Sequence, residues 1–305
     1  MRVIVLGGSG FIGNSLLKLP EMQKHEAIVV TRNPQHIKKY ADRGIEAVVW
    51  DYATNSLLKP YLQGHYAIIN LAGENIGGLW TGAHKKRIMQ SRRKIALKLS
   101  ELVNSSVVKP EVIIQASASG YYGSQGEKEI DEQHKKGKGF LSDVAAITEE
   151  SLQIKSDKTR VIYIRTGIVL GKGGGFVKRL FIPFKLYLGG HFGRGKQWLP
   201  WIHRYDEVKA ISFLLDKPGS HGVYNLCSPN PVRMRHFCKI FGKILYRPSW
   251  LHIPAFLLKL VLGDFARELL LTSVKMKPER LLKEGFHFEF TDPEVALKDL
   301  FSENG

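Results

Sequence analysis

The first thirteen residues constrain the fold more than any other stretch of this chain. An apolar run over residues 3–6 stops at three glycines spaced G-x-x-G-x-x-G, Gly7, Gly10 and Gly13, and residues 11–19 then carry a helical pattern. A strand, a glycine turn and a helix in this order are typical of a dinucleotide-binding βαβ unit. A plain strand–helix connection remains the alternative, because glycine-rich turns also occur without a ligand.

Each glycine has its own physical task in such a turn. Gly7 permits the tight turn, Gly10 keeps a Cβ away from a pyrophosphate, and Gly13 lets the helix pack closely on the strand. Phosphates would meet free backbone N–H groups at the positive end of the helix dipole. These glycines, with Phe11 and Ile12 at the helix start, are therefore predicted to bind a cofactor.

Short apolar runs alternate with helical patterns along the first two thirds of the chain. The predicted strands are residues 3–6, 27–30, 47–50, 67–71, 112–116 and 161–164, and the predicted long helices are residues 81–104 and 140–154. This alternation predicts an α/β fold with a Rossmann-like, doubly wound parallel sheet. We expect residues 1–170, with 200–230 returning to them, to form the nucleotide-binding domain. Residues 171–199 and 231–305 would form a smaller, mainly helical domain on the substrate side.

The charge of the chain is strongly basic and unevenly distributed. The formal net charge is +17, and no acid occurs within residues 75–100, 158–205 or 217–263. Such segments favour anionic ligands, nucleic acid or an anionic membrane, although solvated lysine faces explain them equally well. Nucleic acid is the least favoured partner, because no nucleic-acid module is recognisable.

Other classes of protein are disfavoured by composition. No apolar run reaches the about 20 residues of a membrane span, and the glycines interrupt the N-terminal apolar run too early for a signal peptide. Cys227 and Cys238 form no CxxC motif and are expected to be free thiols in the core, and the eleven histidines show no metal-ligand spacing. We therefore expect a cytoplasmic protein without a metal site, whose oligomeric state the sequence leaves open.

Ligands of open α/β sheets bind beyond the carboxyl ends of the strands, so polar and small residues at those ends should converge on one cleft. The candidates for cofactor binding are Arg32, Asp51, Asn70, Leu71, Ala72, Gly73 and Arg165. Arginine at position 32 stands where an acid would bind the ribose 2′-hydroxyl of NAD, and its guanidinium suits a 2′-phosphate instead. NADP(H) is therefore favoured over NAD(H). Asp51 could meet the adenine edge or serve as a plain turn residue.

With these residues in view, the chain resembles the extended short-chain dehydrogenase/reductase superfamily. Within it, the resemblance is to the NAD-dependent epimerase/dehydratase-like branch, whose sugar-nucleotide epimerase-like members carry a small C-terminal domain and are sometimes labelled cell-division inhibitor-like. The matching strings are Gly7–Gly13, Asn70–Ile76, Ser91-Arg92, Ser117–Ser119, Gly120–Gly123, Arg165–Gly171, Trp198–His203 and Tyr224–Leu226. The resemblance covers nearly the whole chain and implies that Ser117 supplies the catalytic hydroxyl that polarises a substrate oxygen.

The chain departs from the superfamily at its acid/base pair. The superfamily places Tyr-x-x-x-Lys on one face of the helix that follows the serine strand, but Phe140 and Val144 occupy those positions here. Ordinary dehydrogenase or epimerase chemistry is therefore in doubt. Tyr121 and Tyr122 are candidate substitutes, and either would need a neighbouring cation to become a useful acid or base. The candidate substrate-binding residues are Glu74, Arg194, Trp201 and His203.

Two functions remain open. The first is an NADP(H)-binding, epimerase/dehydratase-like oxidoreductase that acts on a small, possibly anionic or nucleotide-linked substrate. The alternative is a non-catalytic regulatory protein that senses NADP(H) and acts through a protein partner, which the loss of the Tyr/Lys pair favours.

Overall fold

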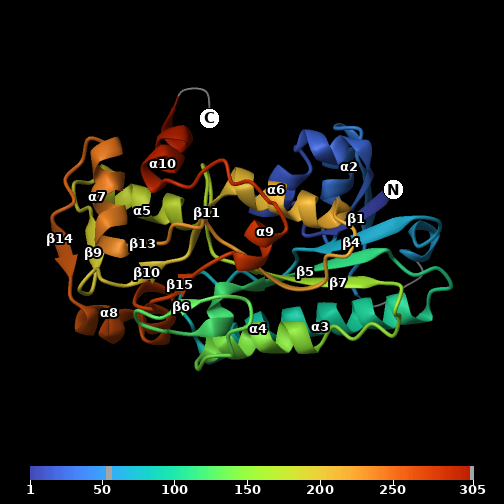
Figure 1. Ribbon diagram of the computed structural model, residues 1–305, viewed down its shortest axis with the longest axis horizontal. Coiled ribbons are helices and arrows are strands. Elements are labelled where there is room, and N and C mark those ends of the chain that lie inside the picture. The colour runs from blue at the N-terminus through green and yellow to red at the C-terminus, as the bar shows by residue number, and fades with distance from the viewer. Residues whose placement is uncertain (53–56, 303–305) are drawn as a thin grey trace.

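The computed structural model describes residues 1–52 and 57–302. A sheet of seven parallel strands lies at its centre, in the order β12-β7-β5-β4-β1-β2-β3 (Figure 1). Its strands are β1 (Arg2–Leu6), β2 (Glu26–Thr31), β3 (Glu46–Val49), β4 (Tyr66–Asn70), β5 (Val112–Ala118), β7 (Arg160–Thr166) and β12 (Gly222–Leu226). The prediction of a Rossmann-like, doubly wound parallel sheet is confirmed.

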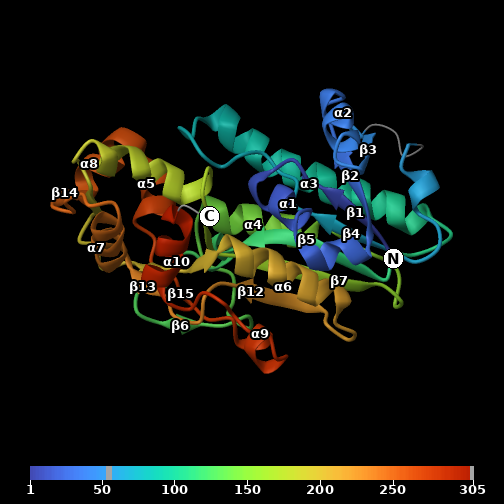
Figure 2. The same cartoon turned by 90° about the horizontal axis from the view of Figure 1, so that it is seen from above.

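Helices cover both faces of this sheet, which explains why its strands are apolar throughout. In β1, Val3 and Val5 pack on the side of α1 (Phe11–Leu16) and α6 (Arg204–Asp216). Ile4 and Leu6 pack on the opposite side, against α3 (Gly82–Ser105). Successive side chains of a strand alternate between faces, so two covered faces require apolar residues at every position. Figures 1 and 2 show the two helix layers on either side of the sheet.

Two predicted helices end earlier than their patterns suggested. Helix α1 stops at Leu16, because Leu17 and Leu19 turn into the core and Pro20 begins a 3₁₀ turn, η1 (Pro20–Lys24). Helix α4 (Phe140–Glu150) ends four residues before the predicted boundary. There the backbone N–H of Gln153 donates to Ser100 Oγ on α3, which draws the chain across the neighbouring helix.

A second group of elements lies at the left of Figure 1. Its helices are α5 (Gly175–Lys185), α7 (Met234–Ile244), α8 (Ala255–Leu262) and α10 (Pro293–Phe301). Short strand pairs join them: β9 (Gly190–Phe192) with β14 (Leu251–Ile253), and β10 (Trp198–Leu199) with β13 (Val232–Arg233). These pairs were not predicted, because strands of two or three residues are too short to show an alternating pattern.

The remaining elements lie between strands of the sheet or between the sheet and the second group. They are α2 (Gln35–Ala41), η2 (Lys59–Tyr61), η3 (Ser119–Tyr122), α9 (Glu279–Lys283), and the paired strands β6 (Glu129–Ile130) with β15 (Lys275–Met276) and β8 (Ile168–Leu170) with β11 (Trp201–His203). Cys227 and Cys238 are both free and buried. No helix in residues 1–52 and 57–302 combines the length and the apolar character needed to cross a bilayer.

A buried carboxylate anchors the C-terminal segment to the helix layer. Asp206, in the first turn of α6, is 1% exposed and accepts hydrogen bonds of 2.9 Å from the backbone N–H groups of Glu289 and Phe290. Burial raises the pKa of Asp206, and the two donated bonds oppose that rise. The carboxylate thus replaces water as the partner of two backbone donors.

We predict that Asp206→Asn lowers the free energy of unfolding by about 1–3 kcal/mol, because the amide nitrogen faces one of the two backbone donors and leaves it unpaired. Urea unfolding measures the change. Asp42→Asn is the matched control, since Asp42 is exposed at the end of α2. Equal stability of the two variants would contradict the anchoring role.

Candidate functional site

A cavity of about 530 Å³ opens at the carboxyl edge of the sheet. It brings together the turn after β1, the segment after β4, the end of β5, the loop after β7, and helices α4 and α5. The predicted site residues that line it are Gly7, Gly10, Phe11, Ile12, Gly13, Leu71, Ala72 and Ser117. Residues from three strand ends that are distant in sequence therefore share one cleft.

The glycine turn depends on missing side chains. Gly7 has a φ of +79°, and a Cβ there would lie 2.8 Å from the backbone nitrogen of Ala72. A Cβ at Gly13 would lie 2.4 Å from the carbonyl oxygen of Gly7. At the start of α1, Gly10 makes no side-chain capping bond, and the first turn holds no acid. The turn therefore leaves backbone N–H groups facing the cleft, a donor set that fits phosphate oxygens.

The residues predicted at the second and third strand ends do not line this cavity. Arg32 is exposed after β2 and makes no ion pair within the described residues, and Asp51 is exposed after β3. After β4, Asn70 is buried; its side chain donates to Gln115 and accepts from the backbone of Ala72. Gly73 lies against the guanidinium of Arg92. Asn70 thus shapes the segment that carries Leu71 and Ala72 into the cleft.

Ser117 is held by a buried ion pair. Its Oγ donates a 2.6 Å hydrogen bond to Glu149 Oε1 on α4. The same carboxylate accepts two bonds from Arg165, Nε at 2.9 Å and Nη2 at 2.8 Å, in a bidentate geometry. Arg165 is 4% exposed and does not line the cavity. Its cation therefore acts on the cleft through Glu149.

Both predicted tyrosines contact the other side of this arginine. The Arg165 guanidinium lies 3.3 Å from the Tyr121 ring centroid, and its Nη1 donates to the Tyr122 hydroxyl at 3.1 Å. Tyr122 donates in turn to Asn225 on β12 at 2.6 Å. Burial raises the pKa of Tyr122 far above its usual range. Neither tyrosine is among the described residues that line the cavity.

The positions of the missing Tyr/Lys pair are apolar in the structure as well as in the sequence. Phe140 packs edge-on against Trp80, with ring centroids 5.1 Å apart, and Val144 lines the cavity. Glu268, in the π-helical turn η4 (Ala266–Leu270), accepts bonds from the backbone N–H groups of Phe140 and Leu141. A carboxylate from the C-terminal segment thus caps α4 beside the cleft.

Two arginines that the sequence analysis did not select also line the cavity. Arg92, on α3, donates to the carbonyl oxygens of Glu74 and Ile88, and burial lowers its pKa. Arg179, on α5, lies against Gly77 and makes no ion pair within the described residues. The string Ser91-Arg92 carried part of the family resemblance and was the one available signal for Arg92. Within the described ranges neither guanidinium forms an ion pair, although the charge of Glu74 acts on Arg92.

The predicted substrate-binding residues lie outside the lining that the structure describes. Trp201 is buried and donates to the carbonyl oxygen of Asn230. The ring of His203 accepts from the backbone of Tyr205 at the start of α6, and burial lowers its pKa to about 4. Glu74 lies 3.7 Å from Arg87, and Arg194 is exposed. Their binding role stays a prediction.

Glu207 is a buried acid that the sequence analysis missed. It lies on α6, is 0% exposed and lines the cavity. Thr166, at the end of β7, donates to its Oε1 at 2.8 Å, whereas Oε2 has no hydrogen-bond partner within the described chain. Burial raises the pKa of Glu207 to about 8. Burial therefore favours the protonated side chain at pH 7, and its Oε2 is enclosed without a hydrogen-bond partner in the described chain.

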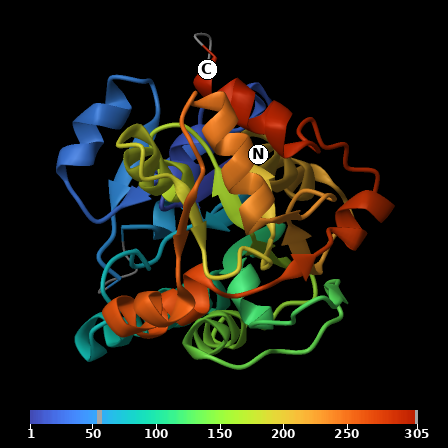
Figure 3. The same ribbon diagram turned by 90° about the vertical axis from the view of Figure 1, so that its left-hand side faces the viewer.

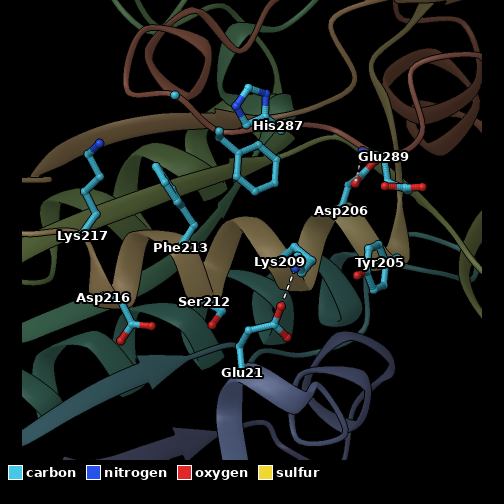
Figure 4. A pocket seen from close by; sticks show the side chains of 12 residues that line it. Glu21, Tyr205, Asp206, Lys209, Ser212, Phe213, Asp216, Lys217, His287 and Glu289 are labelled. Atoms are coloured by element: carbon cyan, nitrogen blue, oxygen red, sulfur yellow. Dashed lines mark hydrogen bonds and ion pairs between the residues drawn. The ribbon is translucent and has the colours of Figure 1, made fainter. Parts of the chain in front are cut away.

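A second cavity, of about 550 Å³, shares no lining residue with this cleft (Figure 4). It lies along α6, where Lys209 pairs with Glu21 and Asp216 pairs with Lys24 at 2.6 Å. In the described ranges, no group of three or more His, Cys, Asp or Glu side chains is placed to hold a metal ion. The first cavity is therefore the one that combines the glycine turn with polar groups at the strand ends.

The cleft and the sheet order can now be compared with known proteins. A family model described as the NAD dependent epimerase/dehydratase family matches residues 3–227. The chain belongs to this family. A second model, described as a domain of unknown function (DUF1731), matches residues 253–300. The earlier resemblance to this branch of the superfamily is confirmed.

Relatives match over almost the whole length of this family member. The chloroplastic homologue of epimerase family protein SDR39U1 from Arabidopsis thaliana is 36% identical over 98% of this chain and 86% of its own. Epimerase family protein YfhF of Bacillus subtilis is 32% identical over 99% of both chains. The crystal structure of human SDR39U1 with NADPH superposes with a TM-score of 0.88 at 31% identity, and covers 98% of this chain and 99% of that one.

We predict that the free energy of unfolding falls as pH rises from about 5 to about 8, because Glu207 must lose its proton in the folded protein. Its folded-state pKa lies above the usual 4.5, so the native state binds the proton more tightly than the unfolded chain between those values. The loss reaches at most about 1.4 kcal/mol per pH unit. Glu207→Gln should remove this contribution to the slope of the unfolding free energy against pH.

Chemical unfolding at several pH values measures that slope, and Glu150→Gln, at an exposed position, is the control. The same slope in Glu207→Gln as in the unaltered protein would contradict the prediction.

Proposed function

We propose that this protein binds NADP(H) and acts as an epimerase/dehydratase-like oxidoreductase on a small anionic or nucleotide-linked substrate. The observation that carries the proposal is the single cleft that joins an uncapped glycine turn to Ser117 and its buried ion pair. The human relative crystallised with NADPH supports the choice of cofactor.

The donor set of the cleft suits a dinucleotide laid across the strand ends. The turn of Gly7, Gly10 and Gly13 would hold the pyrophosphate, and Arg32 would pair with a 2′-phosphate at the far end. We propose that four further residues shape or contact the same site: Asp51, Asn70, Gly73 and Arg165. Arg165 would act through Glu149. A bound nicotinamide supplies the hydride donor or acceptor.

Two hydroxyl side chains at strand ends, those of Ser117 and Thr166, bond to acids on opposite faces of the sheet. Ser117 on β5 bonds Glu149 of α4, on one face of the sheet, whereas Thr166 on β7 bonds Glu207 of α6, on the other face. A substrate against Val144 and Ser117 would therefore lie on the α4 side. Neutral Glu207 would donate a hydrogen bond to a carbonyl acceptor on the α6 side.

Ser117 and Glu149 offer a proton path in place of the missing Tyr/Lys pair. Because the Ser117 hydroxyl donates to Glu149, its lone pairs remain free to accept from a substrate hydroxyl. The proton that leaves that hydroxyl passes to Ser117 as the Ser117 proton passes to Glu149. Glu149 keeps its two bonds from Arg165 and later returns the proton to Ser117. Tyr121 and Tyr122 would position Arg165 rather than touch the substrate.

The charge of the cleft indicates the substrate class. Arg92 and Arg179 line it and make no ion pair in the part of the chain that the structure describes, beside apolar walls that include Leu141 and Val144. A planar guanidinium binds phosphate or carboxylate oxygens in pairs. A substrate with an anionic group and a reactive hydroxyl or carbonyl fits this combination.

We predict that NADPH binds more tightly than NADH and that Arg32→Ala removes the difference. The guanidinium contributes a charge-assisted bond to the 2′-phosphate, and its loss should cost NADPH about tenfold or more in affinity while leaving NADH unchanged. Calorimetric titration measures both. Arg93→Ala, which removes an equally exposed charge from α3, is the control. Equal affinity of the unaltered protein for NADPH and NADH would refute the phosphate assignment.

We predict that Ser117→Ala abolishes turnover and leaves NADPH affinity within about twofold, because a group that acts on the substrate contributes mainly to kcat. Oxidation of NADPH is followed with a panel of anionic carbonyl compounds and sugar nucleotides. Ser105→Ala, at the end of α3, is the matched control. If Ser117→Ala turns over as fast as the unaltered protein, the proton path is wrong.

A second function is favoured by one observation. Phe140 and Val144 replace the proton-carrying pair, and Phe140 is packed against Trp80. A protein with this site could sense NADP(H) and signal to a protein partner without turnover. NADPH binding with no oxidation of any substrate in the panel, together with a cofactor-dependent change in protease sensitivity of the C-terminal segment, would favour this sensor over the enzyme.

A further inference from the structure

One end of the molecule carries an apolar surface that the cleft does not use. Figure 3 shows this end toward the viewer, with α8 at the lower left and α5 above it. We define the apolar end by Leu186, Tyr187, Trp250, Phe256, Leu260 and Val261. Their exposed fractions run from 56% at Tyr187 to 79% at Leu260. Single exposed apolar side chains are ordinary on protein surfaces, whereas several large ones gathered at one end of a molecule are typical of an interaction site.

Contacts tie the parts of the apolar end together. Trp250 Nε1 donates a 3.0 Å bond to the carbonyl oxygen of Tyr187, which follows α5. The Arg247 guanidinium lies 4.6 Å from the Tyr187 ring centroid. Strand β14 begins directly after Trp250, pairs with β9, and leads through Pro254 into α8. The end of α5 and the segment before β14 are therefore neighbours in the structure, and β14 leads from them to α8 at the same end of the molecule.

Helix α8 itself has almost no polar surface. Seven of its eight residues are apolar, yet Leu258 is the one that the fold buries. Phe256 is 72% exposed and Leu260 79% exposed. A surface helix of an isolated protein normally turns its apolar stripe toward the core. The outward apolar face of α8 is therefore left uncovered by the described residues.

The charge around this face is mostly positive. The two acid-free segments, residues 158–205 and 217–263, include α5, β9, α7, β14 and α8. Lys185 and Lys259 are exposed there, and the exposed Lys243 pairs with Glu294 of α10 at 3.0 Å. The next acids along the chain are engaged elsewhere: Asp264 pairs with Lys85, and Glu268 caps α4. A large share of the basic side chains of the protein therefore lies at this end.

We propose that the apolar end docks on an anionic membrane surface. A second copy of this chain would cover the apolar side chains but would set lysines against lysines, whereas anionic lipid headgroups neutralise them. Helix α8 would lie in the interface plane with Phe256 and Leu260 among the upper acyl chains. Trp250 and Tyr187 would lie at headgroup depth, as amphipathic rings do.

Vesicle binding tests the proposal. The full chain is mixed with vesicles of phosphatidylcholine with or without phosphatidylglycerol and sedimented. We expect binding to the anionic vesicles alone, a decrease with added salt, and a blue shift of tryptophan fluorescence. Of the five tryptophans, all of them in the described residues, Trp250 is the exposed one, and Trp250→Phe should remove the shift.

The double variant Phe256→Glu/Leu260→Glu should lower binding by more than about tenfold, because it replaces two apolar side chains by charges that the lipid repels. Val107→Glu/Val295→Glu adds the same charges at exposed apolar positions elsewhere and should bind like the unaltered protein. Equal binding to neutral and anionic vesicles, or no binding to either, would overturn the proposal. The proposal would also be overturned if light scattering found the unaltered protein as a dimer and the Phe256→Glu/Leu260→Glu variant as a monomer. NADPH titration of each variant separates loss of fold or cofactor site from loss of docking.

Discussion

The buried ion pair between Arg165 and Glu149 is the interaction on which the arrangement of the cleft depends. It connects the carboxyl end of β7 to α4, and Ser117 of β5 joins the same carboxylate. Through Tyr122 and Asn225 it reaches β12 at the sheet edge. Removing one partner of a buried pair leaves an uncompensated charge and typically costs about 3–5 kcal/mol. The pair therefore holds Ser117, α4 and two neighbouring strands in one geometry.

This arrangement divides the cleft into two chemically different sides. On the α4 side, Ser117 is bonded to Glu149, which accepts two bonds from Arg165. On the α6 side, Glu207 has one hydroxyl partner, and burial keeps it protonated at neutral pH. The same residue type thus has different surroundings on the two faces of the sheet, because the Glu149 carboxylate pairs with a cation and the Glu207 side chain is enclosed in the core. Glu268 adds a link from the C-terminal segment to the start of α4, so that segment helps to close the cleft.

Most of the sheet could be predicted from the sequence, since each central strand is a short apolar run between helical segments. The strand boundaries moved by one or two residues, and α1 and α4 ended early where side-chain hydroxyls or a proline drew the chain away. The glycine turn, Ala72 and Ser117 were predicted together because they follow strand ends, and the topology brings strand ends together. The two-residue and three-residue strands were not predicted, because they form only where a distant segment supplies the hydrogen-bond partner.

The sequence by itself determined the doubly wound sheet, the glycine turn and the absence of the Tyr/Lys pair, because periodicity, spacing and residue type are local properties. Only the tertiary structure decided which charged groups face the cleft. Arg165 lies near the carboxyl end of β7, yet it points to Glu149; Arg92, Arg179 and Glu207 enter the lining from helices. It also decided that parts of two separate acid-free segments share one end of the molecule. These outcomes depend on side-chain direction and on pairings between segments far apart in the chain, which no local pattern records.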